Sequence, residues 1–251
     1  MKIFVINLRR RMDRRISMET QLNREKLPFE IIPALELKDI QKSDVSGVFN
    51  KGTMYQPNEI ACSASHRLIY ARMIKDNIPK AMIFEDDVVM PVDFSNIVEA
   101  LDNHTYDDID WLQVDYPSVG FGFIRQWTKV YVGFFEFKIT YMLKFFVKFP
   151  IVVAVSLYEQ FLLWFVGQTF QSRIPTVVRF YRDVYFASCY IVTLSAAKKL
   201  LAAQTPLMYT ADKLPNMLKK EGFKMRICIP RFTYQDNQSF GSDLTPVIPR
   251  K

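Results

Sequence analysis

Glu85, Asp86 and Asp87 interrupt an otherwise apolar stretch, residues 81–89, which has a proline close to each end. An apolar run between turn signals predicts a buried strand of a parallel sheet, and such sheets bind ligands beyond the carboxyl ends of their strands. Neighbouring carboxylates raise one another's pKa unless a cation lies among them, and their oxygens suit Mg²⁺ or Mn²⁺. We therefore predict a metal site with Asp87 and Glu85 as ligands and Asp86 beside them. The metal would bind a phosphorylated substrate. An acidic, solvated loop is the alternative.

A basic segment follows the first apolar run of the chain. Residues 7–15 read Asn-Leu-Arg-Arg-Arg-Met-Asp-Arg-Arg. A strand that opens into a basic loop and a helix N-terminus can hold a phosphate group. We therefore predict that Asn7, Leu8, Arg14 and Arg15 contribute to a phosphate site beside the carboxylates. The alternative is a solvated basic face, which is what most charge runs form.

A helix predicted to begin at Asn58, as its N-cap, and to end near residue 77 carries a histidine. At helical spacing His66 shares one face with Glu59 and Cys62. A lone histidine is more often structural than functional, but the chain has two in all, so His66 is a candidate cofactor-binding residue. The three cysteines form no CxxC motif, which argues against zinc and fits a reducing compartment.

The other elements follow from hydrophobic periodicity. Strands are predicted at residues 2–8, 29–34, 109–114, 186–193 and 224–230, and helices at 9–22, 94–101, 195–203 and 211–221. The alternation of strands and helices predicts an α/β fold with a mostly parallel central sheet in a single domain, residues 1–251.

Composition narrows the class of partner. The 251 residues are 49% hydrophobic and 24% charged, which indicates a folded globular chain. A net charge of +7 favours anionic partners such as nucleotides, phosphorylated lipids or membrane surfaces. No nucleic-acid-binding motif is found, so we expect no nucleic acid partner. The N-terminal apolar run is too short for a secretory signal, and we expect a cytoplasmic protein.

Residues 116–185 form a hydrophobic, basic insertion, with eight Lys and Arg against three acidic residues. Within it, residues 149–167 contain a single charged side chain, Glu159, and come close to the roughly 20 apolar residues of a membrane span. A true span would separate the two halves of the sheet. We therefore predict helices lying at an anionic membrane surface. A buried helical hairpin or the interface of a homo-oligomer is the alternative.

Several motifs together resemble glycosyltransferase family 25, the lipooligosaccharide-type galactosyltransferases. Residues 84–88 read Phe-Glu-Asp-Asp-Val, like the strand end of that family, and residues 59–66 match its Glu-x-Ala-Cys-x-x-Ser-His helix start. Further similarities lie at Asn7-Leu8, Asp13-Arg14-Arg15, Tyr190, Asp212 and residues 235–239, where Gln235 replaces a histidine of some relatives.

The resemblance implies a GT-A-like nucleotide-sugar-binding fold and an inverting glycosyltransferase. Mn²⁺ or Mg²⁺ would bridge the carboxylates and the diphosphate of a UDP-sugar, UDP-galactose by analogy. The base that activates the acceptor hydroxyl would be Asp212, or else Asp115. A lipid-linked oligosaccharide or lipopolysaccharide would be the acceptor, met at the inner face of a bacterial inner membrane. The alternative function is a non-catalytic basic module that binds membrane surfaces.

Overall fold

The computed structural model describes residues 1–45, 57–115, 175–179, 183, 186–229 and 231–236. The chain divides into two compact units, Met1–Asp115 with Pro175–Lys251 and Tyr116–Ile174. The second unit lies outside the described residues, and with it most of the predicted membrane-associated insertion. In the described part of the chain, no helix combines the length and hydrophobicity that crossing a membrane requires.

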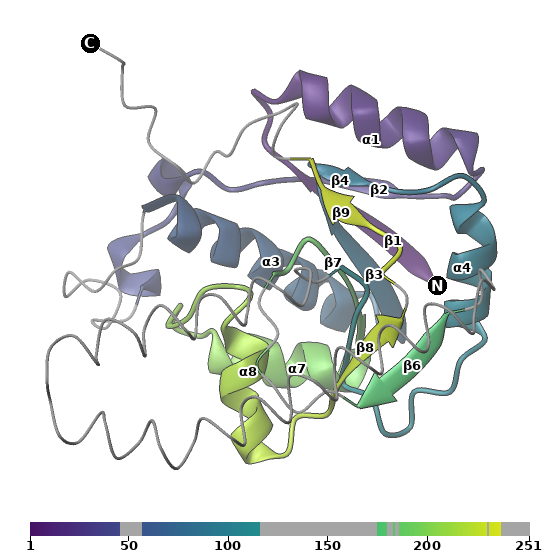
Figure 1. The fold of residues 1–251 in the computed structure, drawn as a ribbon. Helices are drawn as coiled ribbons and strands as arrows, with labels where there is room; N and C mark the ends of the chain where they lie inside the picture. Colours follow the sequence, from purple (N-terminus) through teal and green to yellow (C-terminus); the bar gives the residue numbers. More distant parts are fainter. Residues whose placement is uncertain (46–56, 116–174, 180–182, 184–185, 230, 237–251) are drawn as a thin grey trace, which may run out of the picture. The chain divides into compact units, whose positions relative to one another are not determined.

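A seven-stranded sheet in the order β2-β1-β3-β7-β5-β8-β6 forms the centre of the first unit (Figure 1). Its strands are β1 (Lys2–Asn7), β2 (Glu30–Pro33), β3 (Lys80–Glu85), β5 (Trp111–Gln113), β6 (Thr176–Arg179), β7 (Cys189–Thr193) and β8 (Met225–Ile229). Five of them run in one direction, and β7 and β6 run in the other. The mostly parallel sheet is therefore confirmed. Strand β6, which lies inside the range assigned to the insertion, was not predicted.

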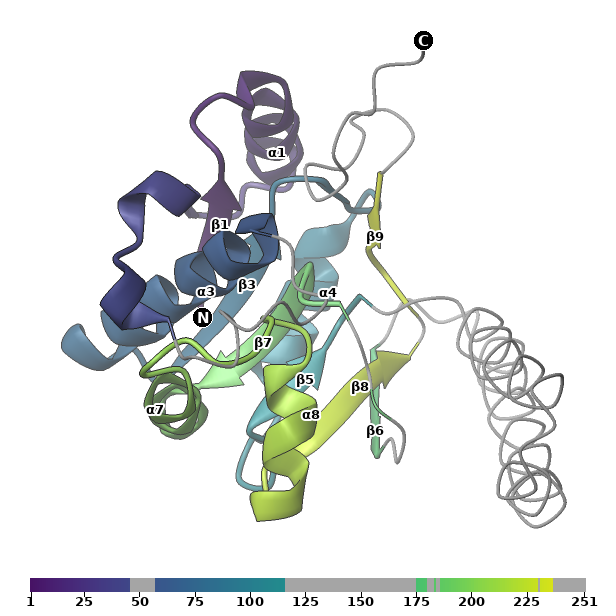
Figure 2. The ribbon, with the colours of Figure 1, turned by 90° about the vertical axis from the view of Figure 1, so that its left-hand side faces the viewer.

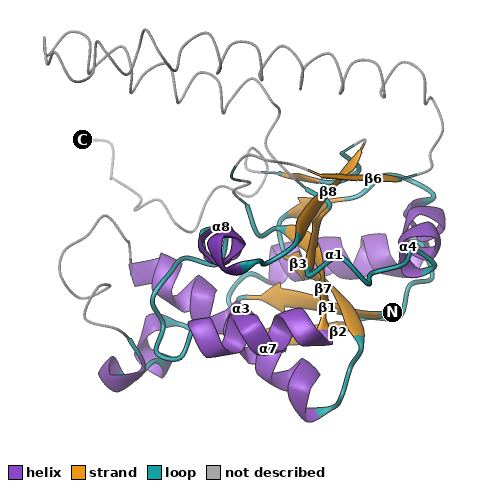
Figure 3. Ribbon diagram, turned by 90° about the horizontal axis from the view of Figure 1, so that it is seen from below, coloured by secondary structure: helices purple, strands orange, loops and turns teal. Residues whose placement is uncertain are grey.

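Helices cover both faces of the sheet (Figures 2 and 3). They are α1 (Met12–Arg24), α3 (Pro57–Lys75), α4 (Phe94–Asp102), α7 (Leu194–Ala203) and α8 (Leu214–Leu218), with short 3₁₀ turns at Leu37–Asp39, Lys42–Asp44 and Lys219–Glu221. Helices α1 and α4 pack on one face, and α3 and α7 lie together on the other. Helix α3 begins at Pro57 rather than after Asn58, because proline is well tolerated in the first turn of a helix.

The core follows the alternation of side chains along the strands. Ile3 and Val5 of β1, with Met82 and Phe84 of β3, belong to the core cluster that includes residues of α1 and α4. Because the strands are covered on both sides, the intervening positions are buried as well. This double coverage fixes the sheet and leaves its carboxyl edge as the place where polar groups can gather.

The strand predicted over residues 81–89 is wrong in one respect, because it is interrupted. Strand β3 ends at Glu85, Asp86 and Asp87 form a turn, and β4 (Val88–Val89) leaves the central sheet. There β4 pairs with β9 (Tyr234–Gln235) in a separate two-stranded sheet. In this turn the Asp86 carboxylate accepts from Asn7, Leu8 and Arg14, and the Asp87 carboxylate accepts from Gln235.

Candidate functional site

Four chain segments meet at the carboxyl ends of β1 and β3. Strand β7 is antiparallel to β3, so its beginning lies beside the end of β3, where the Glu85 amide donates to the Ser188 carbonyl at 2.8 Å. The Asp236 amide donates to the Asp87 carbonyl at 2.9 Å, which fixes the C-terminal segment over the acidic turn. The sheet topology thus brings residues 7–14, 85–87, 188 and 235–236 to one edge.

Asp86 joins the loop after β1 to the end of β3. Its Oδ2 accepts from the side chain of Asn7 at 2.8 Å and from the amide of Leu8 at 3.3 Å, and its Oδ1 accepts from Arg14 at 3.0 Å. Burial raises the pKa of Asp86 despite these bonds. Both oxygens are engaged by protein groups, so Asp86 holds the phosphate-site candidates Asn7, Leu8 and Arg14 in place.

Glu85 and Asp87 direct carboxylate oxygens toward a common point. The Gln235 side-chain amide donates to Glu85 Oε2 at 3.0 Å and to Asp87 Oδ1 at 3.3 Å. Burial, followed by the charge of Glu85, raises the pKa of Asp87 to about 7, although Arg14 lies 3.5 Å away. With Asp86, three carboxylates lie near two groups that can carry positive charge, Arg14 and His66, and this excess of negative charge suits a divalent cation.

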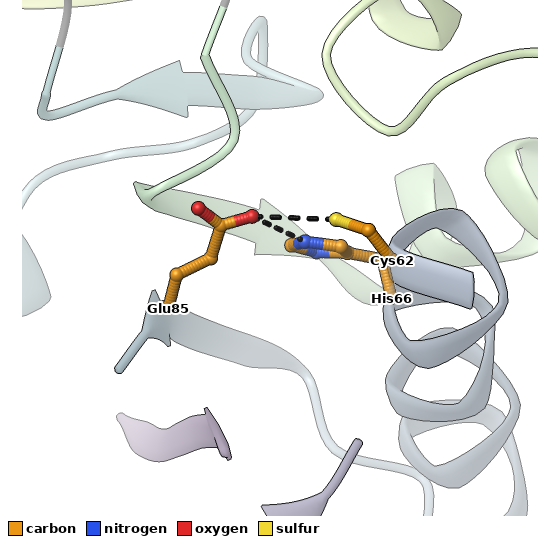
Figure 4. A group of neighbouring side chains, drawn as sticks. All are labelled: Cys62, His66 and Glu85. Atoms are coloured by element: carbon orange, nitrogen blue, oxygen red, sulfur yellow. Dashed lines mark hydrogen bonds and ion pairs between the residues drawn. The ribbon is translucent and has the colours of Figure 1, made fainter. Parts of the chain in front are cut away.

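A buried polar chain lies behind Glu85 (Figure 4). His66 Nε2 lies 3.3 Å and Cys62 Sγ 3.4 Å from Glu85 Oε1. His66 Nδ1 lies 2.8 Å from the hydroxyl of Tyr190, which in turn bonds to Tyr70 at 3.0 Å. Burial opposes ionisation of Glu85, but the bond and charge of His66 outweigh it and lower the pKa of this carboxyl. This series of hydrogen-bonded side chains therefore fixes the orientation of Glu85 and keeps its carboxylate charged.

Two cavities open on either side of Glu85. The larger, about 640 Å³, is lined by Leu8, Arg14 and the acidic turn on one side and by residues 34–38 after β2 on the other. The smaller, about 240 Å³, is lined by Asp212 among others. Cys62, Glu85 and Gln235 line both, so they form the boundary between the two spaces.

The structure separates the two candidate bases. Asp212 lines the smaller cavity, and its Oδ1 accepts from the Thr210 hydroxyl at 2.6 Å. Asp115 is 2% exposed and accepts from Ser188 at 2.5 Å, with Arg231 3.7 Å away, and it lines neither cavity. Asp212 therefore faces the same cavity as Glu85, whereas Asp115 is buried and does not line that cavity.

Two other candidates lie apart from the cavities. Arg15 pairs with Glu19 at 2.8 Å along α1 and lines neither cavity. Asn7 also lines neither, and it acts through Asp86. Tyr190 was recognised in the sequence only as part of a strand. A tyrosine in an aliphatic buried strand needs a partner for its hydroxyl, and that signal could have linked it to His66.

Comparisons with known proteins identify the family of the chain. The model of the family described as glycosyltransferase family 25 (LPS biosynthesis protein) matches residues 1–215. Procollagen galactosyltransferase 2 of Homo sapiens is 27% identical over 121 residues, 44% of this chain and 19% of that protein. Procollagen galactosyltransferase 2 of Mus musculus is 28% identical over 138 residues, 51% of this chain and 21% of that protein. The chain thus spans about a fifth of the length of these curated relatives.

Proposed function

The chain belongs to glycosyltransferase family 25, and we propose that it moves galactose from a UDP-sugar to a saccharide acceptor in a metal-dependent, inverting reaction. The names of the two curated relatives support galactose as the sugar. The fold would be of the GT-A type, in which a nucleotide-sugar binds at the carboxyl edge of the sheet.

The observation that carries the proposal is the convergence of Glu85 and Asp87 at the boundary of the larger cavity. Their oxygens surround one amide nitrogen of Gln235, at 3.0 and 3.3 Å, where a hard cation would find two carboxylate ligands. Mn²⁺ or Mg²⁺ bound there would neutralise charge on a departing diphosphate. The residues present fit such an ion because three carboxylates outnumber Arg14 and His66, the two nearby groups that can carry positive charge.

The larger cavity suits the donor. Its volume of about 640 Å³ lies within the roughly 300–1,000 Å³ of typical ligand sites. Arg10 and Arg14 line it and can attract a diphosphate, while Leu8 and Leu35 supply apolar surface for a nucleoside. This division of polar and apolar groups supports UDP-sugar binding.

Asp212 is the base that the geometry favours. It would take the proton from an acceptor hydroxyl in the smaller cavity, the freed oxygen would attack the anomeric carbon, and the bond from that carbon to the diphosphate would break, releasing UDP. Inversion requires the base and the leaving group on opposite sides of the sugar. Arg14 lines the larger cavity and Asp212 lines the smaller one. Because these two cavities share a boundary, the placement of the two side chains supports that arrangement.

The acceptor and the location complete the proposal. A lipid-linked oligosaccharide or lipopolysaccharide would be met at the inner face of a bacterial inner membrane, where the basic, aromatic residues 116–185 would hold the protein at the surface. The description of the family as an LPS biosynthesis protein supports this acceptor class.

Transfer of radiolabelled galactose from UDP-galactose into a lipopolysaccharide fraction, with Mn²⁺, tests the function. We expect Asp212→Asn to lower the rate about 10²–10⁴-fold while UDP binding persists, and Asp107→Asn, an exposed control, to leave it unchanged. Transfer that survives in Asp212→Asn and is lost in Asp115→Asn would reassign the base. Absence of transfer from every UDP-hexose tried, together with absence of UDP binding, would contradict the proposal.

A further inference from the structure

We propose that Cys62, His66 and Glu85 form a Zn²⁺ site that overlaps the carboxylate pair of the donor site. The three side chains each offer one ligand atom, and these atoms all lie within 4.8 Å of one another (Figure 4). The site rests on these three residues. Its effect on nucleotide binding, described below, rests on the proposed function.

The distances fit a zinc ion. Glu85 Oε1 lies 3.3 Å from His66 Nε2 and 3.4 Å from Cys62 Sγ. In a tetrahedral site, bonds of about 2.0–2.3 Å to nitrogen, oxygen and sulfur separate neighbouring ligand atoms by roughly this much. His66 Nε2 and Cys62 Sγ lie within 4.8 Å of each other, so side-chain rotation would bring all three ligand atoms to bonding distance of one ion.

Helix α3 and strand β3 position the three ligands close together. Cys62 and His66 lie one turn apart on the same face of α3, which begins at Pro57, and Glu85 ends β3. The hydroxyl of Tyr190, 2.8 Å from His66 Nδ1, fixes the ring so that Nε2 faces Glu85. A hydrogen-bond partner on the second ring nitrogen is the usual support of a metal-bound histidine.

An ion can reach the site from solvent. Cys62 and Glu85 line both cavities, and the Glu85 side chain is 23% exposed, whereas that of His66 is 1% exposed. The cavity side leaves a fourth position for water, which is the pattern of a three-ligand zinc site. On binding, the thiol S–H bond breaks, an S–Zn bond forms, and the proton passes to solvent.

Zinc is favoured here over the harder ions of the donor site. Sulfur and imidazole ligands select Zn²⁺, and such sites bind it more tightly than Mn²⁺. The sequence argued against zinc because its cysteines are not clustered. That reasoning considered cysteine spacing, whereas the proposed site takes its third ligand from a strand, 19 residues beyond the histidine.

Sharing of Glu85 makes the two ions exclusive. Zinc held by Cys62 and His66 would draw Glu85 away from Asp87, so the hard-ion site would lose one of its two carboxylates. We therefore expect Zn²⁺ to inhibit Mn²⁺-dependent nucleotide binding, because it competes with Mn²⁺ for Glu85.

Two titrations test the site. Titration with Co²⁺ reports thiolate ligation by an ultraviolet charge-transfer band, and titration with Zn²⁺ is followed by calorimetry. We expect one equivalent of Zn²⁺ and the cobalt band in the wild type and in Cys228→Ala, whose cysteine is buried in β8. Cys62→Ala should lose the band and weaken Zn²⁺ binding about tenfold or more, and His66→Gln should weaken it similarly. Thermal melting confirms that each variant is folded.

The outcomes separate this inference from the proposed function. Absence of the band in the wild type, or a band that persists in Cys62→Ala, would overturn the zinc site. A band without any Mn²⁺-dependent UDP binding would support the zinc site and contradict the proposed function. If the wild type binds both Zn²⁺ and, with Mn²⁺, UDP, the Zn²⁺ concentration that halves UDP binding should rise about tenfold or more in Cys62→Ala. An unchanged concentration would overturn the overlap of the two metal sites.

Discussion

At the scale of single residues, the three consecutive acids have three different tasks. Asp86 is occupied by protein donors and ties β3 to the loop after β1. Glu85 is oriented from behind by His66. Asp87, with its pKa raised to about 7 by burial and by the charge of Glu85, is the carboxylate that gains most from a cation. The sequence predicted the cluster but could not divide its roles, because the partners come from four distant segments.

The ion pair of Arg14 and Asp86 allows a test of this division. Both side chains are buried and 3.0 Å apart, so Arg14→Met should lower the free energy of unfolding by about 3–5 kcal/mol by leaving a buried charge uncompensated. Asp86→Asn in the same chain should recover part of that loss. Arg15→Met, which breaks a partly exposed pair with Glu19, should cost less than about 1 kcal/mol. Denaturant unfolding measures all four proteins, and equal losses for Arg14→Met and Arg15→Met would contradict the structural role of Asp86.

At the scale of elements, long periodic segments were predicted well and interruptions were not. The helix 9–22 and the strand 2–8 appear as α1 and β1 with shifts of a few residues. The run 81–89 was predicted as one strand because its apolar residues continue on both sides of the acids. The break at Asp86 and Asp87 depends on Asn7, Arg14 and β9, which no local pattern reveals. Strand β6 was missed because its four residues adjoin an aromatic, basic stretch that dominated the pattern.

Helix α4 depends on a cap from another helix. The side chain of its N-cap residue, Asp93, makes no capping bond, and the Ser95 amide donates to Glu25, at the end of α1, at 3.2 Å. Burial opposes ionisation of Glu25, but the bonds from Arg24 and Ser95 lower its pKa below the ordinary 4.5. Glu25→Ala should therefore lower the free energy of unfolding by about 1 kcal/mol near neutral pH.

The sign of the pH dependence follows from that lowered pKa. A carboxyl that ionises more easily when folded stabilises the protein above its ordinary pKa, and this stabilisation is lost as the pH falls through the folded value. The difference between wild type and Glu25→Ala should therefore shrink between about pH 7 and about pH 3. Denaturant unfolding at both pH values measures it, with Glu25→Gln as the variant that keeps an acceptor. An equal difference at both pH values would argue against a charged cap.

At the scale of the molecule, every described strand belongs to one compact unit, Met1–Asp115 with Pro175–Lys251. Glu85 and the residues that contact its side chain belong to the same unit. The class of fold followed from the alternation of strands and helices. The reversed direction of β7 did not, because no local pattern in the sequence specifies the direction of a strand within the sheet. That reversal brings Ser188 to Glu85 and Tyr190 to His66, so the site depends on it.

Replacement of residues 116–174 by a short Gly-Ser linker tests the division of the molecule. We expect the shortened protein to fold and to bind UDP with Mn²⁺ as the full chain does, because the candidate ligands lie in the other unit. Binding to vesicles that contain anionic phospholipid should be lost with the basic residues. Cosedimentation with vesicles and calorimetry give the two readouts. Vesicle binding that survives the deletion would contradict a membrane role for residues 116–174.

The central claim is that Glu85 and Asp87 hold a cation that binds a nucleotide diphosphate. The most direct measurement is calorimetric titration of UDP into the 251-residue protein with and without Mn²⁺, repeated with Asp87→Asn and with Asp107→Asn as the exposed control. We predict binding with Mn²⁺ in the wild type and the control, and no binding without the metal or in Asp87→Asn. UDP binding that is equally tight without Mn²⁺, or that is unchanged in Asp87→Asn, would contradict the claim.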